Sequence, residues 1–248
     1  MRTIDLNADL GEEAGSDDEL LQLVTSASVA CGAHAGSEQT IRSVVRRAGE
    51  FGVAVGAHPG YPDREGFGRR ELGATPADIE RWVRLQLETF VEICGDEGVP
   101  VRYVKAHGAL YNRAVHDAAA AAAFVGAVAA THRELAVLAL PASQMLVAAR
   151  AAGMRTVREA FLDRGYLADG SLAPRDSAGA MITDASTAAQ RALQLARGES
   201  ILDVDGRPLA IAADSLCVHG DSPDALATVR MVRERLAVEG IGMKAFAQ

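Results

Sequence analysis

Cysteine is scarce in this sequence and has no metal-binding spacing. The 248 residues contain three cysteines, Cys31, Cys94 and Cys217, and no Cys-x-x-Cys pair. An odd count without such a pair argues against a disulfide framework and against a thiolate zinc site. We therefore expect free thiols in a reducing compartment, and we interpret Cys31 and Cys217 as small apolar core residues.

Long apolar runs and an excess of positive charge are also missing. The first residues, MRTIDLN, lack the apolar segment of a signal peptide. The longest apolar run, residues 118–130, is shorter than the roughly 20 residues that a membrane span needs. Acidic side chains outnumber basic ones by 33 to 25, giving a net charge of −8, which argues against nucleic acid or an anionic membrane as the main partner. The sequence predicts a cytoplasmic metabolic protein; it leaves the oligomeric state open, a homo-oligomer included.

Phosphate-binding loops, internal repeats and low-complexity linkers do not occur either. Without a Gly-x-x-x-x-Gly-Lys-Ser/Thr segment the chain is not expected to be an independent P-loop ATPase. A chain of 248 residues can bury one large core without help from a metal or a disulfide. We expect a single domain over residues 1–248.

Short apolar runs alternate with helical patterns along the whole chain. The predicted strands are residues 3–6, 26–30, 53–56, 101–105, 135–140, 156–160 and 215–218. The predicted helices are residues 17–24, 37–49, 75–94, a segment from about Asp117, residues 143–152 and 184–196, and a closing helix that opens at Pro223. We expect a polar turn at residues 7–12, a hairpin at 201–211 and a long loop over the mouth at 167–182.

This alternation is typical of a parallel α/β fold. Polar segments follow at least six of the strands, and a closed ring of parallel strands would bring all of them to one mouth. An open doubly wound sheet would gather them only near a switch point. The sequence therefore predicts a distorted seven-stranded parallel β/α barrel.

Histidines and carboxylates gather where these strands end. Four of the six histidines, His34, His58, His107 and His219, fall one to four residues after a predicted strand. Nearby carboxylates are Asp5 or Asp9, Glu12, Asp63, Glu159, Asp163 and Asp221. Imidazoles with one or two carboxylates suit a divalent metal that polarises an amide or ester oxygen. The alternative is that these groups only bond to one another and to the loops.

Cationic side chains stand beside them. Lys105 would stabilise a developing oxyanion, or it would form an ion pair with an acid from a neighbouring strand. Arg69, Arg70 and Arg164 are candidates for a two-pronged grip on a carboxylate or phosphate.

Seven segments carry a resemblance to a known family. They are residues 5–12 (DLNADLGE), 30–36 (ACGAHAG), 56–63 (GAHPGYPD), 66–70 (GFGRR), 104–112 (VKAHGALYN), 159–164 (EAFLDR) and 217–221 (CVHGD). In this order they resemble the motifs of the LamB/YcsF family over almost the whole chain. The resemblance implies a barrel akin to glycoside hydrolases and polysaccharide deacetylases. It also implies ATP-dependent opening of 5-oxo-L-proline to L-glutamate by a 5-oxoprolinase that includes partner subunits B and C.

Residue roles follow from combining the resemblance with the chemistry. Asp9, His58 and His107 would bind a metal or activate water, and Lys105 would stabilise the oxyanion. The expected substrate-binding residues are Asn7, His34, Arg69, Arg70, Asn112, Arg164, His219 and Asp221. ATP is the expected co-substrate, with a partner protein helping to handle it because no P-loop is present.

Two other functions remain open at this stage. A stand-alone metal-dependent amidase or carbohydrate deacetylase would suit the same barrel. A ligand-sensing module that binds a small acid without turnover is the alternative that is not an enzyme.

Overall fold

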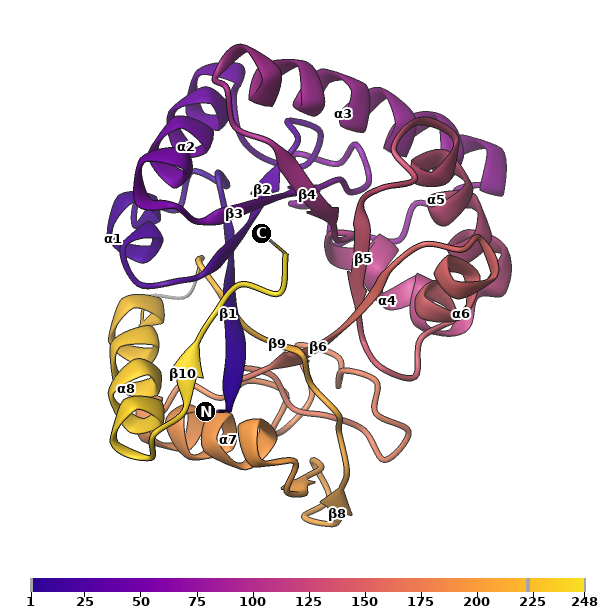
Figure 1. Cartoon of the computed structure of the whole chain (residues 1–248). Helices are drawn as coiled ribbons and strands as arrows, with labels where there is room; N and C mark the ends of the chain where they lie inside the picture. Colours follow the sequence, from indigo (N-terminus) through magenta and orange to yellow (C-terminus); the bar gives the residue numbers. More distant parts are fainter. Residues whose placement is uncertain (1, 222–223, 248) are drawn as a thin grey trace.

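A computed structural model describes residues 2–221 and 224–247 of the chain. Seven parallel strands form a closed ring in the order β1-β2-β3-β4-β5-β6-β9, and β9 pairs back with β1. Helices surround this ring (Figure 1). The predicted seven-stranded parallel β/α barrel is confirmed.

The ring strands and the helices have the following bounds. The strands are β1 (Thr3–Leu10), β2 (Ser26–Ala30), β3 (Ala54–His58), β4 (Val101–Val104), β5 (Ala136–Ala139), β6 (Thr156–Phe161) and β9 (Ser215–His219). The helices are α1 (Asp17–Leu21), α2 (Glu38–Phe51), α3 (Pro76–Asp96), α4 (Gly108–His116), α5 (Ala118–Thr131), α6 (Gln144–Ala151), α7 (Ala185–Arg197) and α8 (Ala225–Val238). The predicted hairpin is confirmed as the antiparallel pair β7 (Ile201–Leu202) and β8 (Pro208–Leu209).

Helix ends follow the local sequence. Ser37 accepts a hydrogen bond from the Thr40 backbone at the start of α2, and the left-handed Gly52 ends that helix. Thr75 and Asp78 form a capping box at the start of α3. In the described part of the chain no single helix is long and apolar enough to cross a membrane; α4 and α5 pass that test only as a pair bent by 118°.

Strand β1 corrects one expectation. A polar turn was expected from residue 7, but the strand continues through Leu10 and is buried from Ile4 onward. Alternate residues point to opposite faces of a strand, so Leu6 and Leu10 join the apolar layer under the helices while Asp9 points into the barrel. The acidic segment stays in the strand because the barrel interior supplies polar partners for it.

Three further features differ from the expectation or fall outside it. Helix α4 is not among the predicted helices; its first residue is Gly108, which has a φ of 57°. One more strand, β10 (Gly242–Met243), joins the large sheet by pairing with β1, outside the seven-stranded ring. Pro223, the expected start of the closing helix, lies outside the described residues.

The chain's last residues cover the amino-terminal end of the barrel. Strand β10 pairs with the start of β1, and the carboxyl terminus lies near the centre of the ring in Figure 1. There the Phe246 ring meets the Tyr103 ring with centroids 5.0 Å apart. We call this closed end the floor and the opposite, carboxyl-terminal end the mouth.

Candidate active site

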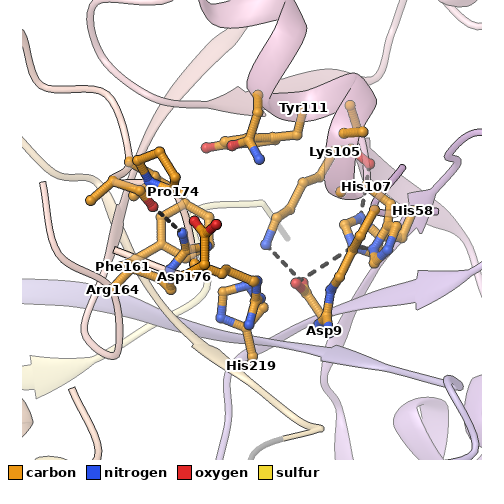
Figure 2. A pocket seen from close by; sticks show the side chains of 18 residues that line it. Asp9, His58, Lys105, His107, Tyr111, Phe161, Arg164, Pro174, Asp176 and His219 are labelled. Carbon is orange, nitrogen blue, oxygen red and sulfur yellow. Dashed lines mark hydrogen bonds and ion pairs between the residues drawn. The ribbon is translucent and has the colours of Figure 1, made fainter. Parts of the chain in front are cut away.

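A cavity of about 460 Å³ opens at the mouth of the barrel. Its wall includes Asp9 from β1, His58 from β3, Phe161 from β6 and His219 from β9, each at or near the carboxyl end of its strand. Figure 2 shows these side chains facing one space together with Lys105 and Arg164. Strands that are far apart in sequence therefore deliver their polar ends to one site, as parallel β/α barrels do.

Lys105 lies at the centre of the site and is almost completely buried. Its Nζ lies 2.7 Å from Asp9 Oδ1 and 2.8 Å from Glu159 Oε1, and it donates to Cys217 Sγ at 3.3 Å. Burial alone would lower the pKa of Lys105, but the negative groups around it, Asp9 foremost, raise that pKa well above its ordinary value. The site thus holds a permanent buried ammonium.

Two histidines beside it face each other in an unusual way. His58 Nδ1 lies 3.0 Å from the Lys105 carbonyl oxygen, so this nitrogen carries the proton and Nε2 of a neutral ring accepts. His107 Nε2 lies 2.8 Å from the Phe67 carbonyl oxygen, so Nδ1 of a neutral ring accepts. Nevertheless, His58 Nε2 and His107 Nδ1 are only 3.0 Å apart. Two acceptors at this distance need a shared proton or a cation between them.

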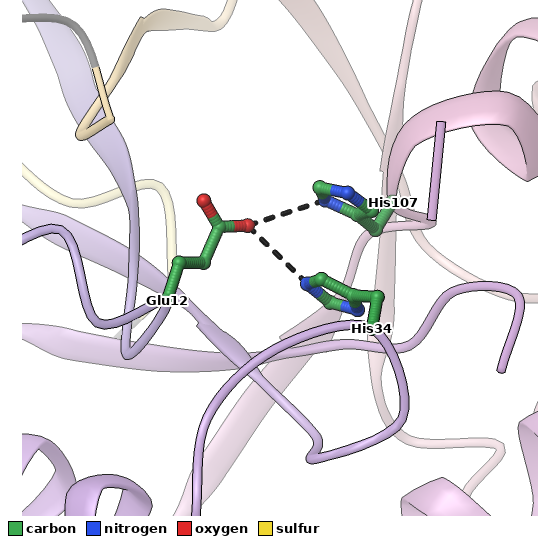
Figure 3. A group of neighbouring side chains, drawn as sticks. All are labelled: Glu12, His34 and His107. Carbon is green, nitrogen blue, oxygen red and sulfur yellow. Dashed lines mark hydrogen bonds and ion pairs between the residues drawn. The ribbon is translucent and has the colours of Figure 1, made fainter. Parts of the chain in front are cut away.

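Carboxylates close around the same point. Asp9 Oδ2 lies 3.5 Å from His58 Nε2, and Glu12 Oε1 lies 3.2 Å from His107 Nδ1 and 3.3 Å from His34 Nε2. Figure 3 shows Glu12 directed at both His34 and His107, and the two rings are stacked with centroids 3.7 Å apart. The ligand atoms of Glu12, His34 and His107 all lie within 4.8 Å of one another.

The electrostatics favour neutral rings at His34 and His107 and ionised carboxylates at Asp9 and Glu12. Burial lowers the pKa of His107 and lowers that of His34 to about 4. Burial would raise the pKa of Glu12 and of Asp9, but the imidazoles of His107 and His34 near Glu12 and the Lys105 ammonium beside Asp9 hold both below their usual range. This protonation state is the one in which such side chains bind a divalent metal.

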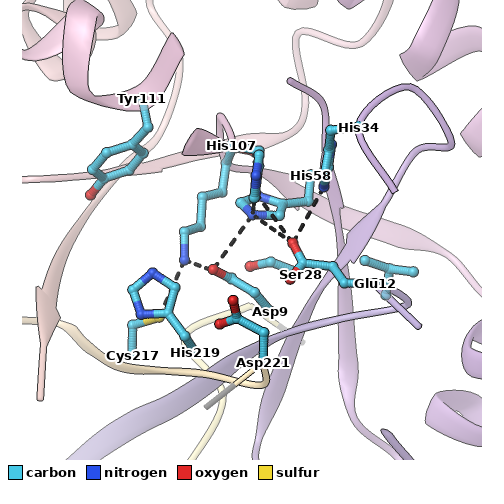
Figure 4. A network of polar contacts seen from close by, with 12 residues as sticks. Asp9, Glu12, Ser28, His34, His58, His107, Tyr111, Cys217, His219 and Asp221 are labelled. Atoms are coloured by element: carbon cyan, nitrogen blue, oxygen red, sulfur yellow. Dashed lines mark hydrogen bonds and ion pairs between the residues drawn. The ribbon is translucent and has the colours of Figure 1, made fainter. Parts of the chain in front are cut away.

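The hydrogen bonds that orient His58 and His107 are also those expected of metal-binding histidines. His58 and His107 each use the second ring nitrogen to donate to a backbone carbonyl, which fixes the ring and its tautomer as metal-binding histidines require. His34 lacks such a supporting bond, because its buried Nδ1 has no hydrogen-bond partner among the described residues. Asp9, Glu12, His34, His58 and His107 together are therefore suited to hold a divalent cation, and Figure 4 shows them as one network.

Basic residues also line the cavity, and two of its charged residues are held in ion pairs. Arg69 pairs with Asp221, with Nη2 2.5 Å from Oδ2, and lies over the Phe67 ring. His219 Nδ1 lies 2.9 Å from Asp163, and Asp163 also accepts from the His219 backbone. Burial opposes ionisation of Asp163, but His219 lowers its pKa. These pairs hold the wall together.

The structure places the predicted substrate-binding residues unevenly. Arg69, Asn112, Arg164 and His219 line the cavity. Asn7 is buried deeper in the barrel, where it donates to Ser215 Oγ at 2.7 Å and does not line the cavity. Arg70 also lies off the cavity wall, because its guanidinium pairs with Asp63 and Glu65.

Other residues of the site were not assigned roles from the sequence. Glu159 pairs with Lys105 and accepts from the Tyr111 hydroxyl at 2.8 Å, and Glu12 joins the histidines. Both are acids near strand ends, so the sequence marked them as candidates, but it did not indicate what either one binds. Arg175, in the long loop after β6, lines the cavity and had no sequence signal that set it apart.

The fold and the site together define a β/α barrel with a buried lysine, carboxylates and histidines at its mouth. The LamB/YcsF family model matches residues 4–248 of this chain. The chain belongs to the LamB/YcsF family.

Relatives and solved structures agree with this assignment. A Streptomyces coelicolor protein named as the A subunit of 5-oxoprolinase is 48% identical, with 98% of this chain and 100% of that protein covered. A Neisseria meningitidis protein of the same name is 43% identical over 99% of this chain and 100% of its own length. The crystal structure of a lactam utilization protein from Thermus thermophilus aligns at 43% identity with a TM-score of 0.91, covering 98% of this chain and 100% of that one.

A more distant structure shares only the fold. The peptidoglycan deacetylase PdaC from Bacillus subtilis aligns with a TM-score of 0.52 at 9% identity, covering 99% of this chain and 88% of that one. This similarity confirms that the barrel has a deacetylase-like fold.

Proposed function

We propose that this chain is the A subunit of an ATP-dependent 5-oxoprolinase. The assembly opens the lactam ring of 5-oxo-L-proline to L-glutamate, hydrolyses ATP to ADP and phosphate, and includes subunits B and C. It works in the cytoplasm. One observation carries the proposal: a chain similar over its whole length to proteins named as the A subunit of 5-oxoprolinase places a buried ammonium, carboxylates and imidazoles around a cavity of about 460 Å³.

The reaction explains why a coupled ATP is needed. A five-membered lactam is an unstrained, resonance-stabilised amide, so neither its reactivity nor the equilibrium favours opening in water. Phosphorylation of the amide oxygen by ATP would activate the carbonyl carbon. Water then adds its oxygen to that carbon, the carbon–nitrogen bond breaks, and the ring nitrogen takes up a proton to become the amine. The acyl phosphate that results is cleaved by a second water to the side-chain carboxylate of glutamate and free phosphate.

Lys105 is the residue best placed to meet negative charge that develops on the amide oxygen. Its Nζ donates to Asp9 and to the Cys217 sulfur, a weak acceptor, and forms an ion pair with Glu159 without a hydrogen bond. An oxygen that enters the cavity is a better partner than sulfur for the N–H that is directed at Cys217. A preorganised cation in a buried site stabilises an oxyanion much more than it would in water.

The imidazole and carboxylate cluster would manage the attacking water. Asp9 and His58 lie at the cavity wall beside Lys105, so a water held there would face the same carbonyl carbon. His107 extends this wall through its contact with His58. A divalent cation held by Asp9, Glu12, His34, His58 and His107 would supply Lewis-acid polarisation when bound.

Nucleotide handling is assigned in part to the partner subunits. The chain has no P-loop segment, and Arg69 at the cavity is already paired with Asp221.

Reconstitution tests this proposal. The purified chain is incubated with 5-oxo-L-proline and ATP, alone and with subunits B and C, and glutamate and phosphate are measured. We expect turnover only in the complete mixture, with one phosphate released per glutamate. Removal of acetyl groups from an acetylated sugar by the chain alone would contradict the proposal, as would saturable binding of 5-oxoproline with no turnover in any mixture.

A further inference from the structure

Three arginines line the cavity, and they differ in what they already bind. They are Arg69, Arg164 and Arg175. Arg69 is neutralised by Asp221 at 2.5 Å. Arg164 is buried and directs its guanidinium at the chain itself, with Nη2 2.7 Å from the Ala173 carbonyl oxygen and Nε 3.3 Å from that of Ala180.

Arg175 has no such engagement. Among the described residues its guanidinium forms no ion pair, and its side-chain hydrogen-bond partner is the Met181 sulfur, 3.8 Å from Nη1. Sulfur is a weak acceptor. Burial and the nearby Arg69 lower the pKa of Arg175, so the charge is held in an environment that opposes it. A half-buried cation that has no anionic partner among the described residues is a candidate to bind an anionic ligand.

The loop that carries Arg175 is fixed on both sides. Ala173 is held by the Arg164 guanidinium and by its own N–H, which donates to the Gly165 carbonyl oxygen at 2.9 Å. On the far side the Gly165 N–H donates to the Ala180 carbonyl oxygen at 2.8 Å. The intervening turn is closed by Ser177, whose N–H donates to the Pro174 carbonyl oxygen at 2.9 Å. Arg164 is thus a positioning residue, and Arg175 is presented at the cavity before any ligand binds.

We propose that Arg175 binds the carboxylate of the lactam substrate and thereby selects a small monoanion for the cavity. The inference rests on the proposed function, since it names the group that recognises the substrate of that same site. A guanidinium offers two parallel N–H groups that match the two oxygens of a carboxylate. Lys105 and Arg69 are already compensated by acids, and the Arg164 guanidinium is taken up by backbone carbonyl oxygens. The Arg175 guanidinium, which has no acid beside it among the described residues, suits a single carboxylate better than a triphosphate.

Arg175 and Lys105 would then bind different groups of the substrate. Arg175 holds the ring by its carboxylate at the rim, while Lys105 meets the amide oxygen at the centre. Because the loop is already ordered, binding loses little conformational freedom there, which preserves the affinity gained from the ion pair.

Steady-state kinetics of the complete assembly, with subunits B and C present, test the assignment. Arg175→Gln is compared with Arg175→Lys and with Arg150→Gln, an exposed arginine on α6 away from the cavity. The two substrates are 5-oxo-L-proline and 2-pyrrolidinone, which is the same ring without the carboxylate. Melting temperatures of the variants check that each one folds.

We expect Arg175→Gln to raise KM for 5-oxoproline by about 10- to 100-fold while kcat changes by less than about threefold. Arg175→Lys gives an intermediate KM because it keeps the charge and loses the fork. Neither kcat/KM for 2-pyrrolidinone nor KM for ATP changes, and Arg150→Gln behaves as wild type.

Two results would overturn the assignment. An unchanged KM for 5-oxoproline excludes the carboxylate contact, and a raised KM for ATP alone makes Arg175 a phosphate ligand. If the wild-type assembly does not turn over 5-oxoproline, the proposed function fails separately. Calorimetric titration of the isolated chain with 5-oxoproline then decides: weaker binding by Arg175→Gln than by wild type supports the assignment, and equal or absent binding rejects it.

Discussion

Asp5 and Asp9 lie on the same face of β1, near opposite ends of the barrel interior, and their chemistry is opposite. Asp5, toward the floor, accepts hydrogen bonds from the hydroxyls of Thr25, Ser26 and Ser215. Burial outweighs these neutral donors and raises the pKa of Asp5 to about 6. Asp9, at the mouth, has the Lys105 ammonium and His58 beside it, and its pKa falls well below the usual range.

The difference shows that burial alone does not set the charge of a carboxylate. Both side chains are almost completely buried, so the neighbours decide. The hydroxyl donors favour the ionised form of Asp5 too weakly to offset burial, whereas the Lys105 ammonium and His58 offset it for Asp9. The floor is a hydrogen-bonded polar plug suited to structure. The mouth is a set of permanent opposite charges suited to catalysis.

Replacement of Lys105, the ammonium at the mouth, is expected to have the largest effect on stability and turnover. Lys105→Met leaves Asp9 and Glu159 buried without their partner, so we expect the free energy of unfolding to fall by about 3–5 kcal/mol. Loss of the oxyanion's partner should lower kcat of the assembly by about 100-fold or more. Denaturant unfolding and steady-state assays measure both effects.

Lys244 provides a matched control for that substitution. It is exposed and lies beyond β10, away from the cavity. Lys244→Met should change stability by less than about 0.5 kcal/mol. Equal losses in the two variants would contradict the central role of Lys105.

The cluster proposed to hold a divalent cation offers the next largest test. Glu12→Gln removes the carboxylate charge that faces His34 and His107, so affinity for Zn²⁺ or Mn²⁺ should fall by at least about tenfold. Calorimetric titration of the purified chain measures this affinity. Glu13→Gln, the exposed neighbouring residue, should bind as wild type does, and indistinguishable binding by the Glu12 variant would remove it from the site.

The floor predicts a pH dependence of stability. Because the pKa of Asp5 is raised from 3.8 to about 6, its contribution is complete below about pH 4 and is lost as pH rises through 6. The unfolding free energy of wild type minus that of Asp5→Asn should therefore decrease by about 3 kcal/mol over this range, at about 1.4 kcal/mol per pKa unit. Denaturant titrations at several pH values measure it. Asp205→Asn in the exposed hairpin turn should show no such slope, and a flat difference for Asp5 would contradict the raised pKa.

The smallest effect is expected from a single hydroxyl. The Tyr103 hydroxyl and Ser28 Oγ are 3.1 Å apart within the barrel. Tyr103→Phe should cost about 1 kcal/mol of stability and change turnover by less than about twofold. A large loss of turnover with unchanged stability would contradict the claim that the interior below the mouth serves structure and the mouth serves catalysis.

Sequence reasoning found the fold because the signal is local. Apolar runs separated by helical patterns define seven parallel strands, and Pro76 with its capping residue marks the start of α3. The same local reasoning ended β1 too early. Whether Asn7 and Asp9 can stay in a strand depends on partners such as Ser215, about 200 residues away in the chain.

The sequence predicted where the site residues lie but not which side chains form ion pairs with one another. Strand ends placed Asp9, His58, Lys105 and His107 at one mouth, and the structure brings them together. No sequence pattern shows that Arg69 is neutralised by Asp221 or that Arg175 is left without an acid among the described residues. Those facts depend on side-chain directions across the barrel and on how the loop after β6 is anchored.

Carboxyl-carbon NMR of the chain labelled with ¹³C-aspartate tests the account most directly. Asp5→Asn and Asp9→Asn assign the two signals, and the signals are followed as the pH is lowered. The account predicts that Asp5 is half protonated near pH 6 and that Asp9 is still ionised at about pH 4, where an ordinary aspartate is half protonated. Two signals that titrate together, or an Asp9 that protonates before Asp5, would contradict it.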